Sequence, residues 1–235
     1  MYKRIMVFGA HPDDEIVMAC AIAKMAAEGV EVTVITMTDG SEGYPDPKLK
    51  NKIVALRKKE AKACDRALGI KNREFLDAPD MALSNSKENL KKCIKLIRKY
   101  RPEALFTHGP EDVHRDHRNA HALTRDAYFH ASEPVAVELG APCKKPWLYY
   151  YKSASYDFKE VNYRLPYVSF EVTGYAEKEL EAWKTQRSQY SVFRKTEEDF
   201  NREIEDIKKN RKKVFISFCI AETNTVNQFL ENKEK

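Results

Sequence analysis

Apolar runs and amphipathic segments alternate along the first part of the chain. Runs with the pattern of buried strands cover residues 1–9, 30–37, 74–76 and 104–107. Segments with apolar residues at helical spacing cover residues 14–28, 48–68, 85–100 and 116–132. Strands that alternate with helices in this order form right-handed βαβ units. The pattern therefore predicts a Rossmann-like α/β fold, with a mostly parallel β-sheet flanked by helices on both faces.

The second part of the chain continues this pattern less regularly. After an irregular connection over residues 134–146, strand patterns cover residues 147–152, about 161–172 and 214–220, and helical patterns cover 175–190 and 197–213. We expect these elements to form a C-terminal strand and helix extension of the sheet. Because no repeat, low-complexity segment or linker interrupts the chain, we expect a single domain over residues 1–235. Its core covers about residues 1–135, and residues 136–235 are the less regular part.

Polar loops follow three of the predicted strands, at residues 11–15, 38–43 and 108–117. The carboxyl ends of parallel strands lie at one edge of a sheet, and ligands bind at that edge in folds of this class. We therefore expect the three loops to converge on a single site.

The first of these loops reads HPDDE, residues 11–15. As a helix start it is ordinary, because Pro12 suits the first helical position and acidic residues in the first turn interact favourably with the helix dipole. We interpret Glu15 as such a helix-start residue or as a support for its neighbours. This structural interpretation does not explain why His11 lies three residues before Asp14, since both are of the types that bind metals.

A second group of polar residues, HRDH at 114–117, lies in the third loop. His114 and His117 are three residues apart, so a helix or a turn brings them to one side, and Asp116 can accept a hydrogen bond from an imidazole. Combined with His11 and Asp14, the group offers nitrogen and oxygen ligands in the number that a catalytic zinc ion requires. A lone histidine is more often structural, and we interpret three others in that way: His108, His121 and His130.

Composition narrows the classes of function. The chain has 235 residues, 43% of them hydrophobic and 33% charged, with a net charge of +5. The basic residues alternate with acids, so nothing prompts nucleic-acid binding. The five cysteines are widely spaced without a C-x-x-C, which predicts no disulfide framework and favours a reducing cytoplasm. We expect neither a signal peptide nor a membrane segment, because no apolar run is long enough.

These motifs resemble the LmbE-like (PIG-L) family of zinc-dependent N-deacetylases. Residues 11–15 are similar to the first family signature, and residues 114–117 are similar to the second, H-x-D-H. The loop over residues 38–43 and the pair Arg57-x-x-Glu60 also look like the family. The likeness covers about the first 130 residues. It departs after residue 182, where Gln186 and Arg187 stand in the region in which many relatives carry a histidine before Ser-Gln.

The resemblance implies an enzyme, a zinc-dependent N-deacetylase that removes the acetyl group from an N-acetylated amino sugar or its conjugate. It implies zinc bound by His11, Asp14 and His117, and another divalent metal such as Fe²⁺ stays open. Asp13 would be the general base toward zinc-activated water. His114, as a protonated imidazole with Asp116 behind it, would stabilise the tetrahedral intermediate and act as the acid. Arg57 would bind the substrate, a small molecule. Whether the protein forms a homo-oligomer is left open.

Other interpretations of the function are weaker, and we keep them as alternatives. A nucleotide-binding Rossmann-like module would carry G-x-G-x-x-G after the first strand or a P-loop, and the chain has neither. Two histidines and one carboxylate also suit a non-haem iron oxygenase. A metal-binding relative without deacetylase activity is a third alternative. The aromatic run over residues 147–151 is interpreted as strand packing in preference to a platform for a sugar.

Overall fold

The computed structural model describes residues 2–153, 166–210 and 213–221. Within them a seven-stranded sheet has the order β3-β2-β1-β4-β5-β7-β6. The strands are β1 (Arg4–Gly9), β2 (Glu31–Thr38), β3 (Asn72–Ala78), β4 (Ala104–Thr107), β5 (Trp147–Tyr150), β6 (Tyr167–Glu171) and β7 (Phe215–Ile220). Strands β1 to β5 pair in parallel, and β7 runs antiparallel to both β5 and β6. The mostly parallel sheet is therefore confirmed, with β7 and β6 as its C-terminal extension.

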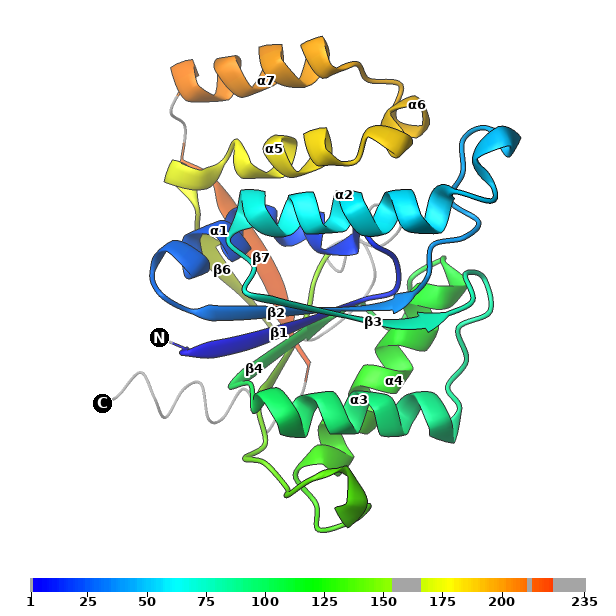
Figure 1. The fold of residues 1–235 in the computed structure, drawn as a ribbon. Coiled ribbons are helices and arrows are strands. Elements are labelled where there is room, and N and C mark those ends of the chain that lie inside the picture. Colours follow the sequence, from blue (N-terminus) through cyan, green and yellow to red (C-terminus); the bar gives the residue numbers. More distant parts are fainter. Residues whose placement is uncertain (1, 154–165, 211–212, 222–235) are drawn as a thin grey trace.

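Helices cover both faces of this sheet (Figure 1). The α-helices are α1 (Ala19–Ala27), α2 (Ile53–Leu68), α3 (Lys87–Tyr100), α4 (Arg115–Ala131), α5 (Lys178–Thr185), α6 (Tyr190–Phe193) and α7 (Glu197–Asn210). Short 3₁₀ helices cover Asp14–Met18, Pro47–Leu49, Val137–Leu139, Thr173–Tyr175 and Arg187–Gln189. Helices α1, α2, α5 and α7 lie on one side of the sheet, and α3 and α4 lie on the other (Figure 1).

Side chains alternate along β1 between two apolar cores. Ile5 and Val7 pack in one core with residues of α1 and α2, whereas Met6 and Phe8 pack in the other with residues of α3 and α4. This alternation is the direct result of the two-residue period of a strand. All of β1 after Arg4 is buried, so the HPDDE loop follows directly from a strand that lies in the core.

Three helix predictions need correction. The helix expected over residues 48–68 begins only at Ile53, after a 3₁₀ turn at Pro47–Leu49. The helix expected over residues 14–28 begins as a 3₁₀ helix, Asp14–Met18, before α1. The helix expected over residues 175–190 is broken at Gln186, where α5 ends and a 3₁₀ turn follows. The break has a long-range cause, because the Ser188 backbone N–H donates to the Glu60 carboxylate (2.7 Å) instead of to a helix carbonyl. Part of the strand expected near residues 161–172, and the C-terminal tail, lie outside the described residues.

The aromatic run over residues 147–151 packs inside the protein, which confirms its interpretation as strand packing. Tyr149 and Tyr151 are each 1% exposed. The Tyr149 ring stacks on Phe106 at 5.1 Å, and the Tyr151 hydroxyl donates to the Phe8 carbonyl (2.8 Å). In the described part of the chain no helix is both long and apolar enough to span a lipid bilayer.

Arg98 on α3 holds the connection that follows α4. The side chain is buried, and within the described ranges its Nε, Nη1 and Nη2 atoms donate to backbone oxygens, at 2.8–3.2 Å. The acceptors are the carbonyls of His130, Ala131, Glu133, Val135, Ala136 and Gly140. His130 and Ala131 are the last two residues of α4, and the other four acceptors lie in the connection that follows it, so Arg98 ties this connection to the end of the helix. We call this group the Arg98 cluster.

Candidate metal centre

Three predicted ligands meet at the carboxyl edge of the sheet. His11 follows β1, Asp14 lies in the adjoining 3₁₀ helix, and His117 lies in the first turn of α4. The Nδ1 atom of His11 lies 3.3 Å from His117 Nε2 and 3.5 Å from Asp14 Oδ2. His117 Nε2 lies 3.3 Å from Asp14 Oδ1. The structure therefore brings together two imidazole nitrogens and one carboxylate from two distant parts of the sequence.

The local chain geometry positions Asp14. The His11 backbone N–H donates to Asp14 Oδ2 (2.7 Å), which turns the carboxylate back toward the end of β1. A Cβ atom on Gly9 would lie 3.0 Å from the Asp14 Cβ, so a larger residue there would crowd this ligand. Glu15 does not join the site: it is fully buried and forms an ion pair with Arg73, which also binds Asp65. Glu15 thus anchors the 3₁₀ helix to β3, in the supporting role expected.

Asp112 supports His117 from behind. Its Oδ2 atom accepts a hydrogen bond from His117 Nδ1 (2.9 Å) and one from the Ser153 hydroxyl (2.6 Å), and Oδ1 accepts one from the His114 N–H (2.8 Å). A proton on Nδ1 leaves Nε2 of His117 free to bind a metal. Burial lowers the pKa of His117, but Asp14 and Asp112 outweigh it and raise this pKa to about 9.

His108 supports Asp14, a role that the structural interpretation of this histidine missed. Its Nε2 atom lies 3.0 Å from Asp14 Oδ2, and its ring stacks on His117 with centroids 3.9 Å apart. His108 is fully buried at the end of β4, and this burial lowers its pKa to about 4. The same Nε2 atom also lies 3.2 Å from the Ala10 backbone N–H, so His108 sits between the Asp14 carboxylate and the end of β1.

Two carboxylates face the other nitrogen of His11. Asp80 Oδ1 lies 3.2 Å and Asp116 Oδ2 lies 3.5 Å from His11 Nε2. Burial lowers the pKa of His11, but Asp14, Asp116 and Asp80 outweigh it and raise this pKa well above its ordinary value. Asp80 was not predicted, although it follows β3 at the same edge of the sheet as the other polar loops.

The contact expected between Asp116 and His114 is wrong for the Asp116 side chain. His114 caps α4, and its Nδ1 atom accepts from the Asp116 backbone N–H (3.2 Å). The Asp116 carboxylate points instead to His11 and accepts from the Met81 N–H (2.7 Å). The cap determines the tautomer, because an Nδ1 atom that accepts a hydrogen bond leaves the proton of a neutral ring on Nε2.

Asp13 and Arg57 form an ion pair beside the three ligands. Arg57 Nη2 donates to Asp13 Oδ1 (2.8 Å), and Nη1 donates to the Gly40 carbonyl (3.3 Å). The Arg57 side chain is 4% exposed, and that of Asp13 is 15% exposed. Asp13 is therefore a carboxylate adjacent to the ligand set, held by Arg57. The substrate contact expected of Arg57 stays a prediction.

The arrangement fits a divalent cation. His11, Asp14 and His117 converge, and each has a buried or nearly buried partner of its own. The surrounding carboxylates keep protons on the two histidines, which is the behaviour of a negatively charged cluster that a cation would neutralise. Asp116 Oδ1 is buried without a hydrogen-bond partner among the described residues. His114 and His108 also lie close enough to take part in groups of potential ligands.

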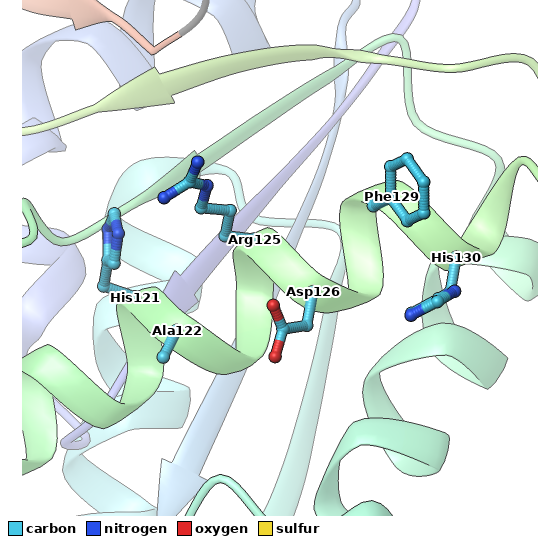
Figure 2. A pocket seen from close by; sticks show the side chains of 6 residues that line it. All are labelled: His121, Ala122, Arg125, Asp126, Phe129 and His130. Atoms are coloured by element: carbon cyan, nitrogen blue, oxygen red, sulfur yellow. The ribbon is translucent and has the colours of Figure 1, made fainter.

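Farther along α4 there is a hollow of about 350 Å³ (Figure 2), and none of the three predicted ligands lines it. It is lined by His121, Ala122, Arg125, Asp126, Phe129 and His130. His121 Nδ1 lies 3.0 Å from the His108 carbonyl, so this histidine ties α4 to the end of β4. Neither His121 nor His130 belongs to a group of potential metal ligands within the described ranges, in line with their structural interpretation.

Comparison with known proteins decides the family. The sequence model of the PIG-L family, described as GlcNAc-PI de-N-acetylase, matches residues 6–128, more than half of the chain. The chain belongs to the PIG-L family. The matched residues include every ligand candidate and supporting residue described above except Ser153.

Relatives of this PIG-L chain include deacetylases of N-acetylated amino sugars. It is 33% identical over 137 residues to a diacetylchitobiose deacetylase of Thermococcus kodakarensis, a match that covers 56% of this chain and 51% of the relative. It is 28% identical over 170 residues to a 1D-myo-inositol 2-acetamido-2-deoxy-alpha-D-glucopyranoside deacetylase of Streptomyces avermitilis, covering 60% and 58%. The chain thus spans between half and three fifths of the length of these relatives.

Solved structures confirm the fold of the PIG-L chain. The N,N'-diacetylchitobiose deacetylase of Pyrococcus horikoshii matches with a TM-score of 0.75 and 24% identity over 94% of this chain and 84% of that one. A 4-carboxy-2-hydroxymuconate hydratase of Pseudomonas putida matches with a TM-score of 0.73 and 21% identity, over 94% and 96%. Because one fold carries both activities, the function has to be argued from the site.

Proposed function

We propose that this protein is a metal-dependent hydrolase that removes the acetyl group from the nitrogen of an N-acetylated amino sugar or its conjugate. The observation that carries the proposal is the pairing of two kinds of carboxylate in one loop. Asp14 faces two imidazoles, whereas its neighbour Asp13 pairs with Arg57 beside them. A hydrolase of this type needs one acid on the metal and another that stays free to accept a proton.

His11, Asp14 and His117 would hold the metal. Two imidazoles and one carboxylate suit a catalytic zinc, and the same donors accept Fe²⁺. When bound, the cation would polarise the amide carbonyl and make water more acidic, with a pKa of about 7 for zinc-bound water. The carboxylates behind His11 and His117 keep the metal-facing nitrogens unprotonated once the positive charge is present.

Asp13 would accept the proton of the attacking water. Arg57 keeps this carboxylate in place through the hydrogen bond from Nη2. His114 would donate from Nε2 to the oxygen of the tetrahedral intermediate, because its cap on α4 engages Nδ1. A neutral donor can perform this role, so the protonated imidazole expected from the resemblance is not required.

The proposal of an amino-sugar substrate is based on the names of the relatives. Two PIG-L proteins with 33% and 28% identity are named for the deacetylation of N-acetylated sugars. The pairing of β5 with β7 in one continuous sheet supports the proposal that residues 1–235 form a single domain.

Acetate release from N-acetylglucosamine derivatives with varied aglycones tests the proposed reaction. The zinc-loaded protein should release acetate, and Asp13→Asn should bind zinc as the wild type does yet release almost none. Absence of acetate from every N-acetylated amino sugar would overturn the substrate class. Near-normal rates in Asp13→Asn would overturn the role of Asp13.

A further inference from the structure

The segment after α5 docks onto α2 through one buried carboxylate. Glu60 Oε1 accepts from the Ser188 backbone N–H (2.7 Å), and Oε2 accepts from the Ser188 hydroxyl (2.6 Å). Glu60 is 6% exposed and Ser188 is 8% exposed. Both oxygens of one acid are therefore committed to a single residue that lies 128 positions farther along the chain.

Gln189 carries this contact on to the loop after β2. Its Nε2 atom donates to the Gly43 carbonyl (2.8 Å) and to the Ser188 hydroxyl oxygen (2.9 Å). Gln189 is 6% exposed, so its amide has few alternative partners in water. The neighbouring Gln186 does not reach the loop: its Nε2 atom donates to the Thr185 hydroxyl (3.0 Å).

The glycine loop rests directly on Arg57. A Cβ atom on Gly40 would lie 2.8 Å from Arg57 Nη1, and one on Gly43 would overlap the same atom. Gly40 has a φ of +66°, a conformation that glycine adopts without strain. The Gly40 carbonyl accepts from Arg57 Nη1, while Nη2 of the same guanidinium binds Asp13. A shift of this loop therefore moves the group that holds Asp13.

We infer that Glu60, Ser188 and Gln189 form a latch that positions the proposed general base. The latch holds the Gly40–Gly43 loop, the loop confines the Arg57 guanidinium, and Arg57 orients Asp13. These are positioning residues, since none of the three contacts the ligand set. The inference deepens the proposed function, and its kinetic part rests on that function.

The chemistry of the contacts explains why the latch can act at a distance. Hydrogen bonds to a buried carboxylate are stronger than those between neutral groups. Gln189→Ala takes the donor from the half-buried Gly43 carbonyl, and Glu60→Ala takes the acceptor from the buried Ser188 N–H and hydroxyl, so the loop and the segment move apart to find water. A misplacement of about 1 Å at a reacting group can reduce a rate by about 100-fold.

Hydrogen–deuterium exchange of the full-length protein tests the mechanical part without reference to activity. In Gln189→Ala, the amides of residues 39–44 should exchange at least about five-fold faster than in the wild type, as the loss of one net hydrogen bond predicts. Tyr190→Phe is the matched control, because it removes the neighbouring bond to the Lys184 carbonyl (2.8 Å) and leaves the loop contact intact. Unchanged exchange in both Gln189→Ala and Glu60→Ala would overturn the latch.

Steady-state kinetics test whether the latch positions Asp13. Gln189→Ala and Glu60→Ala should lower kcat by about 10- to 100-fold with unchanged zinc affinity and little change in KM. Glu60→Gln should restore most of the rate, since an amide oxygen can accept the Ser188 N–H. In an Asp13→Asn background, Gln189→Ala should lower the residual rate no further, because the base to be positioned is absent.

The outcomes separate this inference from the proposed function. If the wild type releases acetate and the two effects multiply in the double variant, the latch does not act through Asp13 and the inference fails. If the wild type releases no acetate from any amide, the proposed function fails. The exchange experiment alone then decides whether the latch holds the loop.

Discussion

Two buried polar clusters show opposite designs. In the Arg98 cluster one guanidinium donates to six backbone carbonyls, so the chain itself supplies every partner. At the candidate metal centre four carboxylates surround two histidines, and an oxygen of Asp116 lacks a partner in the described part of the chain. The first cluster is complete without a ligand and serves stability. The second has the donors that a cation would complete, as the proposed chemistry requires.

Loss of a ligand should produce the largest effect. His117→Ala removes a nitrogen that lies 3.3 Å from both His11 Nδ1 and Asp14 Oδ1. We expect zinc binding to be lost and acetate release to fall to the background rate, as measured by metal analysis and a coupled acetate assay. His130→Ala is the matched control on the same helix and should change neither. Retention of stoichiometric zinc in His117→Ala would contradict the ligand assignment.

Loss of the general base should have the next largest effect. Asp13→Asn should lower kcat by about 10²- to 10⁴-fold, the usual contribution of general acid–base catalysis. Zinc affinity should stay within about two-fold of the wild type, because Asp13 pairs with Arg57 and not with the ligands. Isothermal titration measures the zinc affinity alongside the kinetics. If kcat and zinc affinity both fell, Asp13 would not be a general base that is separate from the ligands.

Substitution of Arg98 should lower the stability of the protein and leave its zinc affinity unchanged. Arg98→Ala removes a buried guanidinium that donates to six carbonyls, and we expect it to lower the free energy of unfolding by about 3 kcal/mol. Chemical denaturation measures this change, and zinc affinity of the folded variant should match the wild type. Arg101→Ala is the control, since that exposed arginine makes one long contact with the Pro142 carbonyl (3.4 Å). A loss of zinc affinity in Arg98→Ala would erase the distinction between the two clusters.

Removal of the support for a ligand should have the smallest effect of the series. Asp112→Asn keeps the size of the side chain but weakens its hold on His117 Nδ1. Partners of this kind contribute about 10- to 100-fold to metal affinity. Asp126→Asn, on the outer part of α4, should leave the affinity unchanged. Equal affinities in the two variants would show that Asp112 does not support the metal.

The strands, the helices and the short polar motifs could be predicted because each depends on a local sequence pattern. The strands and helices follow from apolar periodicity, and β4 was predicted with its observed bounds, Ala104–Thr107. Each half of the candidate ligand set is a short motif at a strand end or a helix start, so residue type and spacing were enough to propose it. The convergence of the loops then followed from the parallel sheet.

Long-range contacts determine what the sequence could not reveal. Arg98 lies on a helix rich in lysine, where exposure to solvent is the default, and its burial depends on the path of residues 130–140. The break at Gln186 depends on Glu60, far away in sequence. The orientation of Asp116 toward His11 arises only once α4 and β1 are side by side. Asp80 could have been predicted from the sequence, because it too follows a strand of the parallel sheet.

The most direct test is a zinc titration of chelated wild-type protein, with bound metal and acetate release from an N-acetylated glucosamine derivative measured on the same samples. We predict that activity rises in proportion to bound zinc and reaches its maximum at one ion per chain. Full acetate release without metal, or one bound zinc with no release from any amino sugar, would contradict the assignment of this site as a metal-dependent deacetylase.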